Sequence, residues 1–382
     1  MFEFNQLPEI LKGALLKNIY LKNAQTPIFI FSTEQALYNY NYFINAFKDN
    51  VKIFFPVKTN NNHTLLDLLN KNGSHFEIAS KGELETLKKI NVNCDKVLFG
   101  NPVKIESHIK SAFKKNVNAY AVDCLNEVEK ISKIAPKSNV YLRLEVNNIG
   151  AEWKLNKKFG IESKNAIQLI QQIIKNGLYP TGISFHVGWN NENIETWKKS
   201  LVLCKKLFSE CVKNNIHLKF INIGGGFPAH NLNQYTLLDK ISKEINPIIK
   251  EIKLKFNVEI YAEPGSFITA NAGILVTKVF NIRKRNNQNW AFVDASICEG
   301  FYWIYSGIKY KTFAFPNPNH SIKLKKFIIT GPTCDSQDVF SGNQLLPENI
   351  STKDFLLIYP AGAYNISSNE YNGFPFPKTR II

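Results

Sequence analysis

Short apolar runs alternate with longer stretches of helical periodicity between about residues 50 and 263. Eight runs have the length and the β-branched or aromatic content of buried strands. They are VKIFFPV (51–57), SHFEI (74–78), KVLF (96–99), NAYAVD (118–123), NVYLRLEV (139–146), GISFHV (182–187), HLKFINI (217–223) and EIYAE (259–263). Amphipathic helices are expected between them, one after Ser80 and others at 124–134, 163–176, 193–213 and 235–255. This alternation predicts an α/β fold, and eight strands favour a (β/α)8 barrel over a doubly wound sheet.

The rhythm changes after about residue 272. The segments VTKVFNIRKR, WAFVDAS, KKFIITG and FLLIYP read as strands, and no helix of comparable length separates them. This pattern indicates an antiparallel β domain. The segment PIFIFS, near the start of the chain, could add a strand to the same sheet. We therefore predict a barrel domain at 34–272 and a discontinuous β-sandwich domain formed by 1–33 and 273–382.

The composition and charge limit the class of protein. Of the 382 residues, 44% are hydrophobic, and no low-complexity tract occurs, so a disordered or collagenous protein is excluded. The formal net charge is +16. The basic residues are dispersed in pairs such as Lys198–Lys199, without a long basic run or an aromatic RNA-binding motif. We therefore expect no nucleic-acid partner, but the basic surface could attract an anionic small molecule.

The six cysteines contain no C-x-x-C motif, and no Cys/His group has the spacing of a zinc site. We therefore expect reduced thiols and no metal. The first residues, MFEFNQLPEI, lack the basic region and apolar core of a signal peptide. No apolar run approaches the ~18–20 residues that cross a bilayer. These features favour a soluble, cytoplasmic protein without a membrane partner.

Charged or phosphate-binding groups stand at the ends of six of the eight predicted strands. In chain order they are Lys58, Glu77, Arg143, His186, Gly224–Gly225–Gly226 and Glu263. Functional groups of a (β/α)8 barrel gather at the C-terminal ends of its strands, so we expect these residues to form one site.

Each of these groups also has a plain structural reading. Taken alone, Lys58 could be a surface lysine, His186 a core histidine and the three glycines a simple turn. Taken together they suit different chemistry. A desolvated lysine is a good amine nucleophile, successive glycines let backbone N–H groups approach a phosphate, and a carboxylate can keep a pyridine nitrogen protonated. The combination describes a pyridoxal-phosphate site.

Longer motifs extend this interpretation over almost the whole chain. They are FFPVKTN, FEIASKGELE, LRLEV, KFG, FHVGW, INIGGGFP, AEPGSFITANAG, GPTCDSQD and GAYNISSNEYNGF. In these motifs and their order the chain resembles the fold-type III pyridoxal-phosphate decarboxylases of ornithine, diaminopimelate and arginine. The resemblance implies an alanine racemase-like barrel with a β-sandwich, the cofactor pyridoxal 5'-phosphate (PLP) and an amino-acid substrate. It also implies a homodimer in which both subunits build each active site.

The resemblance further implies a role for each motif residue. Lys58 would form the Schiff base with the cofactor, His186 would stack on its ring, and Gly224, Gly225, Gly226 and Tyr364 would hold its phosphate. Glu263 would pair with the pyridinium nitrogen, with Glu77 and Arg143 nearby. Cys334 would reach in from the partner subunit to return a proton to the product, and Asp335 would face the amine end of the substrate. The carboxylate at Glu263 argues against a racemase, since racemases on this barrel usually present an arginine there.

Three positions depart from the common family pattern. Ser266 stands where an arginine that contacts phosphate or a substrate acid is usual, and Trp189 stands where a small serine is usual. Glu77 replaces an aspartate and adds one methylene. Trp189 would reshape the substrate end of the site, so we count it with Asp335 as a candidate substrate-binding residue.

A fourth departure concerns the substrate. Ornithine decarboxylases carry a Tyr-Asp pair in the β domain that holds the distal ammonium group. The corresponding stretch here, DASICEGFYWIYSGIKYKT (294–312), lacks that pair, and Asp294 and Glu299 lie too early to replace it. This absence and the basic surface suggest an N-acylated, anionic ornithine such as N-citrylornithine, a substrate type of siderophore pathways.

Other functions stay open at this point. Free L-ornithine or another basic amino acid, as in polyamine or lysine metabolism, is the main alternative. Diaminopimelate is disfavoured because the arginine expected at position 266 is missing. An inactive, decarboxylase-like regulator is a further alternative, although such homologues lose cofactor residues that this chain retains.

Overall fold

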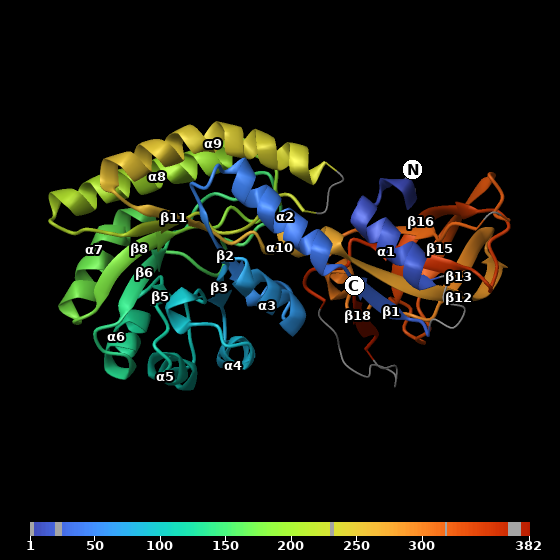
Figure 1. Cartoon of the computed structure of the whole chain (residues 1–382), viewed down its shortest axis with the longest axis horizontal. Coiled ribbons are helices and arrows are strands. Elements are labelled where there is room, and N and C mark those ends of the chain that lie inside the picture. The colour runs from blue at the N-terminus through green and yellow to red at the C-terminus, as the bar shows by residue number, and fades with distance from the viewer. Residues whose placement is uncertain (1–3, 20–24, 230–232, 318, 366–375) are drawn as a thin grey trace. The chain divides into compact units, whose positions relative to one another are not determined.

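The computed structural model describes residues 4–19, 25–229, 233–317, 319–365 and 376–382. Two compact units emerge, Asn39–Phe267 and a second unit formed by Met1–Tyr38 with Ile268–Ile382 (Figure 1). Helix α2 (Thr33–Ala46) and helix α10 (Gly265–Thr269) are each divided between the two units.

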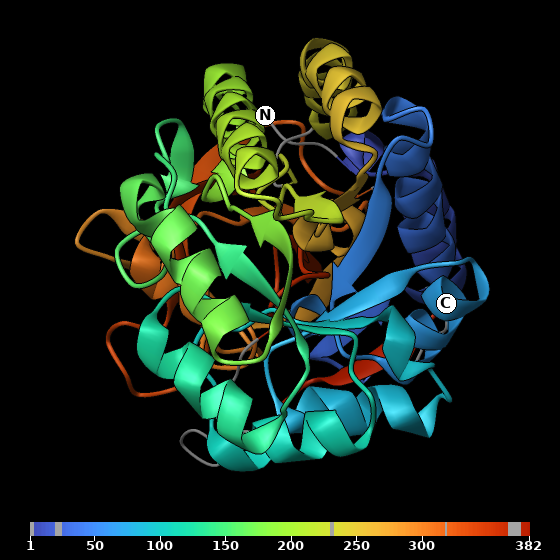
Figure 2. The ribbon, with the colours of Figure 1, turned by 90° about the vertical axis from the view of Figure 1, so that its left-hand side faces the viewer.

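The unit Asn39–Phe267 is a closed parallel barrel, as predicted. Its strands are β2 (Lys52–Pro56), β3 (His75–Ile78), β4 (Val97–Phe99), β5 (Ala119–Val122), β6 (Asn139–Arg143), β8 (Tyr179–Ser184), β10 (Phe220–Asn222) and β11 (Glu259–Ala262). Each strand pairs in parallel with the next, and β11 closes the ring on β2. Figure 2 shows the helices of this unit around its strands.

Besides the short helix α10, seven longer helices follow barrel strands among the described residues. They are α3 (His63–Lys71), α4 (Lys81–Lys89), α5 (Glu106–Lys114), α6 (Leu125–Ile134), α7 (Ser163–Lys175), α8 (Ile194–Lys213) and α9 (Gln234–Phe256). Side-chain caps fix several of their starts: Asn62 Oδ1 accepts from Thr64 N, and Ser80 Oγ accepts from Glu83 N. These caps fix the residue at which the preceding loop ends. Residues of the candidate site lie in or next to such loops.

The barrel interior is filled by side chains. Phe54, Leu98, Ala119, Ala121, Tyr141, Phe220 and Tyr261 form one buried cluster. Phe220 and Tyr261 stack with ring centroids 4.5 Å apart. This packing makes the barrel a rigid support for groups at its strand ends.

A short antiparallel ribbon lies in the loops that follow β6 and β8. Strand β7 (Ala151–Trp153) pairs with β9 (Trp189–Asn191), and Trp153 lies opposite Trp189. The sequence pattern did not predict this ribbon, because three-residue strands show no usable alternation.

The second unit is built on a mostly antiparallel sheet with strand order β14–β17–β12–β13–β15–β16. The strands are β12 (Gly273–Arg285), β13 (Gln288–Val293), β14 (Lys311–Ala314), β15 (Leu324–Thr330), β16 (Val339–Pro347) and β17 (Phe355–Tyr359). Strand β1 (Ile28–Phe31), from the PIFIFS segment, pairs with β12, which confirms that the N-terminal strand joins this sheet. Two pairs are parallel, β13 with β15 and β1 with β18 (Lys378–Ile381).

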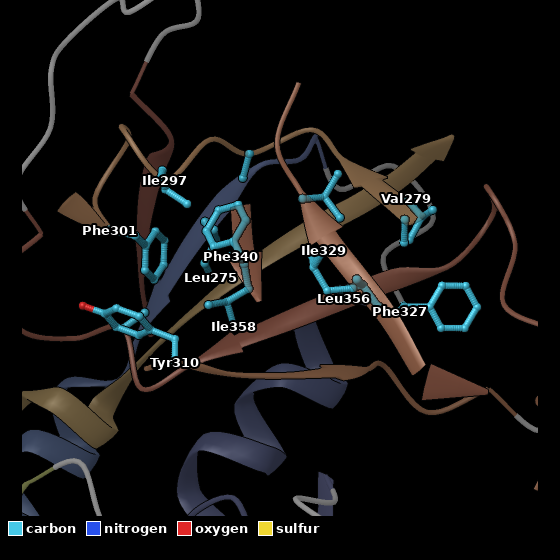
Figure 3. Close-up of a cluster of buried hydrophobic side chains, with 14 of the residues drawn as sticks. Leu275, Val279, Ile297, Phe301, Tyr310, Phe327, Ile329, Phe340, Leu356 and Ile358 are labelled. Carbon is cyan, nitrogen blue, oxygen red and sulfur yellow. The ribbon is translucent and has the colours of Figure 1, made fainter. Parts of the chain in front are cut away.

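Two apolar clusters stabilise this unit. Figure 3 shows the larger one, in which Leu275, Phe301, Ile329, Phe340 and Ile358 come together from strands and from the segment after β13. The other packs helix α1 (Glu9–Ile19) and Leu7 against β1, β12 and β17. Among the described residues, no helix has both the length and the apolar content that a membrane crossing needs.

Candidate active site

Lys58 follows β2 in a 3-10 turn, η2 (Val57–Thr59), and its amine points to the neighbouring strand end. Its Nζ donates to Glu77 Oε2 at 2.8 Å. Glu77 is almost fully buried, whereas the Lys58 side chain is 43% exposed. A buried carboxylate therefore holds a lysine amine that solvent and small molecules can still reach.

Arg143, at the end of β6, lies within electrostatic range of the two site carboxylates. Burial lowers its pKa, and Glu263 and Glu77 act in the opposite sense. A half-buried cation that interacts with both acids helps to balance the charge at this end of the barrel.

His186 follows β8 and is neutral at ordinary pH. Burial holds its pKa well below the usual value, and Arg143 and Lys58 lower it further. Gly188 N donates to His186 Nδ1 at 3.1 Å, so the ring hydrogen of the neutral imidazole is assigned to Nε2. Asn148 Nδ2 donates to the His186 carbonyl at 3.0 Å and fixes the backbone. The imidazole ring therefore presents a flat, uncharged face, and these two hydrogen bonds fix its orientation.

The three glycines after β10 form a turn that admits no side chain. Gly224 and Gly226 have φ of +66° and +97°, which favour glycine. A Cβ on Gly226 would overlap the carbonyl oxygen of Gly188, and one on Gly225 would lie 2.6 Å from the carbonyl oxygen of Glu263. In the part of the chain that the structure describes, nothing accepts the N–H of Gly225 or Gly226. Unpaired backbone donors in a glycine turn suit an anion such as a phosphate.

Glu263 follows β11 and is tied to the glycine turn through Asn222. Asn222 Nδ2 donates to Glu263 Oε1 at 2.6 Å, while Asn222 Oδ1 accepts from Gly224 N at 2.9 Å. Burial, and next the charge of Glu77, raise the pKa of Glu263, whereas Lys58 and Arg143 lower it. This carboxylate can therefore share a proton with a basic nitrogen placed against it.

Sequence reasoning missed the roles of Asn222 and Glu83. Asn222 directly precedes the IGGG segment, which was the available signal. Glu83 stands three residues after Ser80, at the position of a capping box, but its Oε2 accepts from Ala79 N at 2.6 Å, one residue earlier than a capping box requires. Burial and the charge of Glu77 raise the pKa of Glu83 to about 7.

Two of the departing residues contact each other. The indole Nε1 of Trp189 donates to Ser266 Oγ at 3.3 Å. Ser266 is 9% exposed and Trp189 is half-buried. The bond joins strand β9, which follows β8, to helix α10, which follows β11, and β8 and β11 are the two strands that flank β10.

The remaining candidates lie in the second unit. Cys334 is exposed and Asp335 half-buried in the loop between β15 and β16, where Asp335 Oδ1 accepts from Gln337 N at 2.8 Å. Tyr364 has a φ of +56°, and its carbonyl accepts from Trp303 Nε1 at 3.3 Å. The rest of its motif, 366–375, lies outside the described residues. The barrel thus brings together Lys58, Glu77, Arg143, His186, the glycines and Glu263, and it does not contain these three.

Comparisons with known proteins agree with this geometry. The family model for the pyridoxal binding domain of pyridoxal-dependent decarboxylases matches residues 35–270. A lysine/ornithine decarboxylase of Selenomonas ruminantium is 31% identical over 94% of this chain and 91% of its own. A crystal structure of SrLDC with PLP and cadaverine is 29% identical, with a TM-score of 0.85 over 98% of this chain and 94% of that one. The arginine decarboxylase of Paramecium bursaria Chlorella virus is 26% identical, with a TM-score of 0.89 over 97% of this chain and 100% of that one.

The fold and the site together define a cofactor-dependent barrel enzyme with an amine nucleophile and an anion-binding turn. The length of the family match makes the assignment specific: the chain belongs to the pyridoxal-dependent decarboxylase family. It is a PLP-dependent amino-acid decarboxylase, a carbon–carbon lyase.

Proposed function

We propose that this enzyme removes the α-carboxylate of an N-acylated, anionic ornithine, with N-citrylornithine as the favoured substrate, and serves siderophore biosynthesis. The observation that carries the proposal is the state of the two acids in residues 294–312, the stretch that would have to hold a free distal ammonium group. Both oxygens of Asp294 already accept hydrogen bonds, and Glu299 is buried with a raised pKa.

Asp294 is occupied within its own unit. Its Oδ1 accepts from Thr277 Oγ1 at 2.6 Å and from Lys278 N at 2.9 Å, and its Oδ2 accepts from Thr26 Oγ1 at 2.6 Å. An acid that already accepts three hydrogen bonds is a poor partner for a substrate ammonium.

Glu299 is 1% exposed, and its Oε2 accepts from Ser296 N at 3.0 Å. Burial raises its pKa to about 7, with Asp338 and Asp294 adding to the rise. A buried and partly protonated carboxyl attracts a cation weakly. A distal nitrogen without charge, such as an amide, therefore fits this stretch better than an ammonium.

Exposed lysines of the barrel unit would bind the anionic part of the substrate. The ribbon strand β7 continues into a loop with three exposed lysines, Lys154, Lys157 and Lys158. Together with the net charge of +16, they favour an acyl group that carries carboxylates.

The barrel residues would hold the cofactor as follows. Lys58 would supply the amine that binds its aldehyde carbon, and the N–H groups of Gly225 and Gly226 would hold its phosphate. Glu263 would keep a proton at the ring nitrogen, and the neutral His186 ring would pack on the ring face. Glu77 would hold the Lys58 amine, and Arg143 would balance the site carboxylates. When bound, PLP supplies an electron-accepting ring that takes up the electron pair left when CO2 departs.

The proposal includes a homodimer. In it, Cys334 would return a proton to the α-carbon, Asp335 would face the far end of the substrate, and Tyr364 would add a hydroxyl to the phosphate site. Cys334 and Asp335 would act on the barrel of the partner subunit. A reduced Cys334 thiol goes with a cytoplasmic enzyme.

Free L-ornithine or L-lysine is the second candidate substrate. A specific observation favours it, because the relative from Selenomonas ruminantium with 31% identity is named a lysine/ornithine decarboxylase.

The deciding experiment measures CO2 release by the PLP-loaded enzyme with four substrates at matched concentrations. L-Ornithine and L-lysine present a distal ammonium, N5-acetyl-L-ornithine a neutral amide, and N5-citryl-L-ornithine an anionic amide. We expect kcat/KM to rise from the ammonium compounds through the acetyl compound to the citryl compound. A preference for L-ornithine or L-lysine would contradict the proposal and support the second candidate. Equal rates with the acetyl and citryl compounds would remove the anionic requirement.

A further inference from the structure

The hydrogen bond between Trp189 and Ser266 joins the connections that follow β8 and β11, on either side of the strand that ends in the glycine turn. The barrel order places β10 between β8 and β11. Trp189 lies in β9 after β8, Ser266 lies in α10 after β11, and the turn Gly224–Gly226 follows β10. Backbone contacts hold β9 to this turn, since Asn191 N donates to Gly226 O at 2.8 Å.

Because of the direction of this bond, the O–H group of Ser266 is still available to donate a hydrogen bond. An indole N–H can only donate, so Ser266 Oγ is the acceptor. The hydroxyl keeps its own hydrogen, and no described residue accepts it. Ser266 is nevertheless 9% exposed, and a buried hydroxyl normally finds an acceptor.

The same region contains other donors that have no acceptor among the described residues. The N–H groups of Gly225 and Gly226 are also unpaired among the described residues. On the other side of Ser266, Thr59 Oγ1, next in sequence to Lys58, is buried without a hydrogen-bond partner. A cluster of neutral donors beside a glycine turn is suited to an oxyanion.

We propose that Trp189 and Ser266 act as one unit, in which Trp189 is a positioning residue that orients the Ser266 hydroxyl to donate to the cofactor phosphate. The departures from the family pattern at Trp189 and Ser266 are then linked. A neutral hydroxyl, held by an indole, takes the place of the usual charged arginine. This inference rests on the proposed position of the phosphate at the glycine turn.

The test uses the full-length apo-protein and two probes, PLP and pyridoxal, which lacks the phosphate. Dissociation constants are measured by equilibrium dialysis for Trp189→Phe, Ser266→Ala and the double variant. We expect each single variant to weaken PLP binding about ten- to a hundredfold, the range for one lost hydrogen bond to a charged group. The double variant should lose no more PLP affinity than the single variant that binds PLP less tightly. The affinity for pyridoxal should be unchanged in all three variants.

A matched control removes an indole N–H that makes no hydrogen bond. Trp290 Nε1, in the second unit, is buried without a partner, so Trp290→Phe should leave the PLP affinity unchanged. Circular dichroism of every variant reports whether it is folded.

A swapped variant sharpens the test. Trp189→Ser combined with Ser266→Arg restores the usual family residues at both positions. It should recover PLP affinity to within about twofold and make that affinity fall with added KCl, because a charged contact is screened by salt. Each of the two substitutions alone should weaken PLP binding.

Three results would overturn the proposal: additive losses in Trp189→Phe and Ser266→Ala, equal losses for PLP and pyridoxal, or a swapped variant no better than its single variants. Failure of the phosphate placement itself has a different signature. In that case Gly226→Ala would also leave the preference for PLP over pyridoxal unchanged.

Discussion

Glu83 shows how one buried carboxyl ties the site to the stability of the barrel. It lies in the first turn of α4, accepts from Ala79 N, and feels the charges of Glu77 and Lys58. Its pKa of about 7 is above the ordinary value of 4.5. Between these two pH values the folded protein binds more protons than the unfolded chain, so the free energy of unfolding falls as the pH rises.

The variant Glu83→Gln should therefore flatten the pH dependence of stability. Glutamine can still accept from Ala79 N but cannot ionise beside Glu77. We compare the free energy of unfolding of the variant with that of the unsubstituted protein at each pH. The difference, variant minus unsubstituted, should be more positive at pH 8 than at pH 5, by up to about 3 kcal/mol. Urea unfolding at the two pH values measures this difference. Glu85→Gln, which removes an exposed carboxylate of the same helix, is the control and should leave the slope between pH 5 and 8 unchanged. An equal slope in all three proteins would refute the assignment.

Single residues differ in how far the sequence reveals them. Lys58, Glu77, Arg143, His186 and Glu263 could be placed at one end of the barrel because each interrupts or ends an apolar run. Asn222 and Glu83 could not, because what they do depends on hydrogen bonds to particular atoms in other loops. No hydropathy pattern records that Asn222 Oδ1 accepts from Gly224 N. The contact between Trp189 and Ser266 was hidden for the same reason.

At the scale of elements, the turn after β10 depends on the absence of side chains. Its backbone packs against the loop after β8 and against the carbonyl of Glu263. Because these neighbours are backbone atoms, they cannot rotate away as a flexible side chain could.

Gly226→Ala should therefore weaken PLP binding by at least about tenfold and lower the melting temperature. The added Cβ would overlap Gly188 O, and a φ of +97° is strained for alanine. Equilibrium dialysis and thermal unfolding of the apo-protein measure the two effects. The control is Gly82→Ala, at an exposed position of α4 where the nearest atom is 3.6 Å away. That change should keep the PLP affinity and slightly raise the stability, because alanine favours helix. Unchanged PLP affinity in Gly226→Ala would contradict a phosphate at this turn.

The elements of the barrel were easier to predict than those of the second unit. Parallel strands buried on both sides read as continuous apolar runs, and helices separate them regularly. In the second unit, apolar alternation marks strands such as β13 and β15 but does not say which strand lies beside which. The parallel pairing of β13 with β15, and of β1 with β18, joins segments far apart in sequence. Long-range pairing of this kind leaves no local signal.

At the scale of the whole molecule, the proposed active site needs residues from two chains. Lys58 and Glu263 belong to the barrel unit, whereas Cys334 and Asp335 belong to the other unit. The homodimer proposal assigns Cys334 of each chain to the barrel of its partner.

Mixing two inactive variants tests this assignment. Lys58→Ala and Cys334→Ala should each be nearly inactive, but random pairing of the two subunits should restore about a quarter of the normal sites, because each mixed dimer has one intact site. CO2 release after mixing measures the recovery, and size-exclusion chromatography reports the dimer. The control mixes Lys58→Ala with Glu263→Ala. Both defects lie in the barrel, so no mixed dimer has an intact site. No recovery with Cys334→Ala would contradict shared sites.

The amide of Asn222 also has a consequence for which cofactors the barrel can accept. One side of the amide holds the glycine turn and the other holds Glu263, so a single planar group sets the distance between them. Under the proposed placement, these are the contacts for the two ends of PLP. Asn222 would then fix the distance between the two contacts. A cofactor analogue with a longer or shorter phosphate arm could not reach both the glycine turn and Glu263. Adapting the barrel to such an analogue would require both loops to move together.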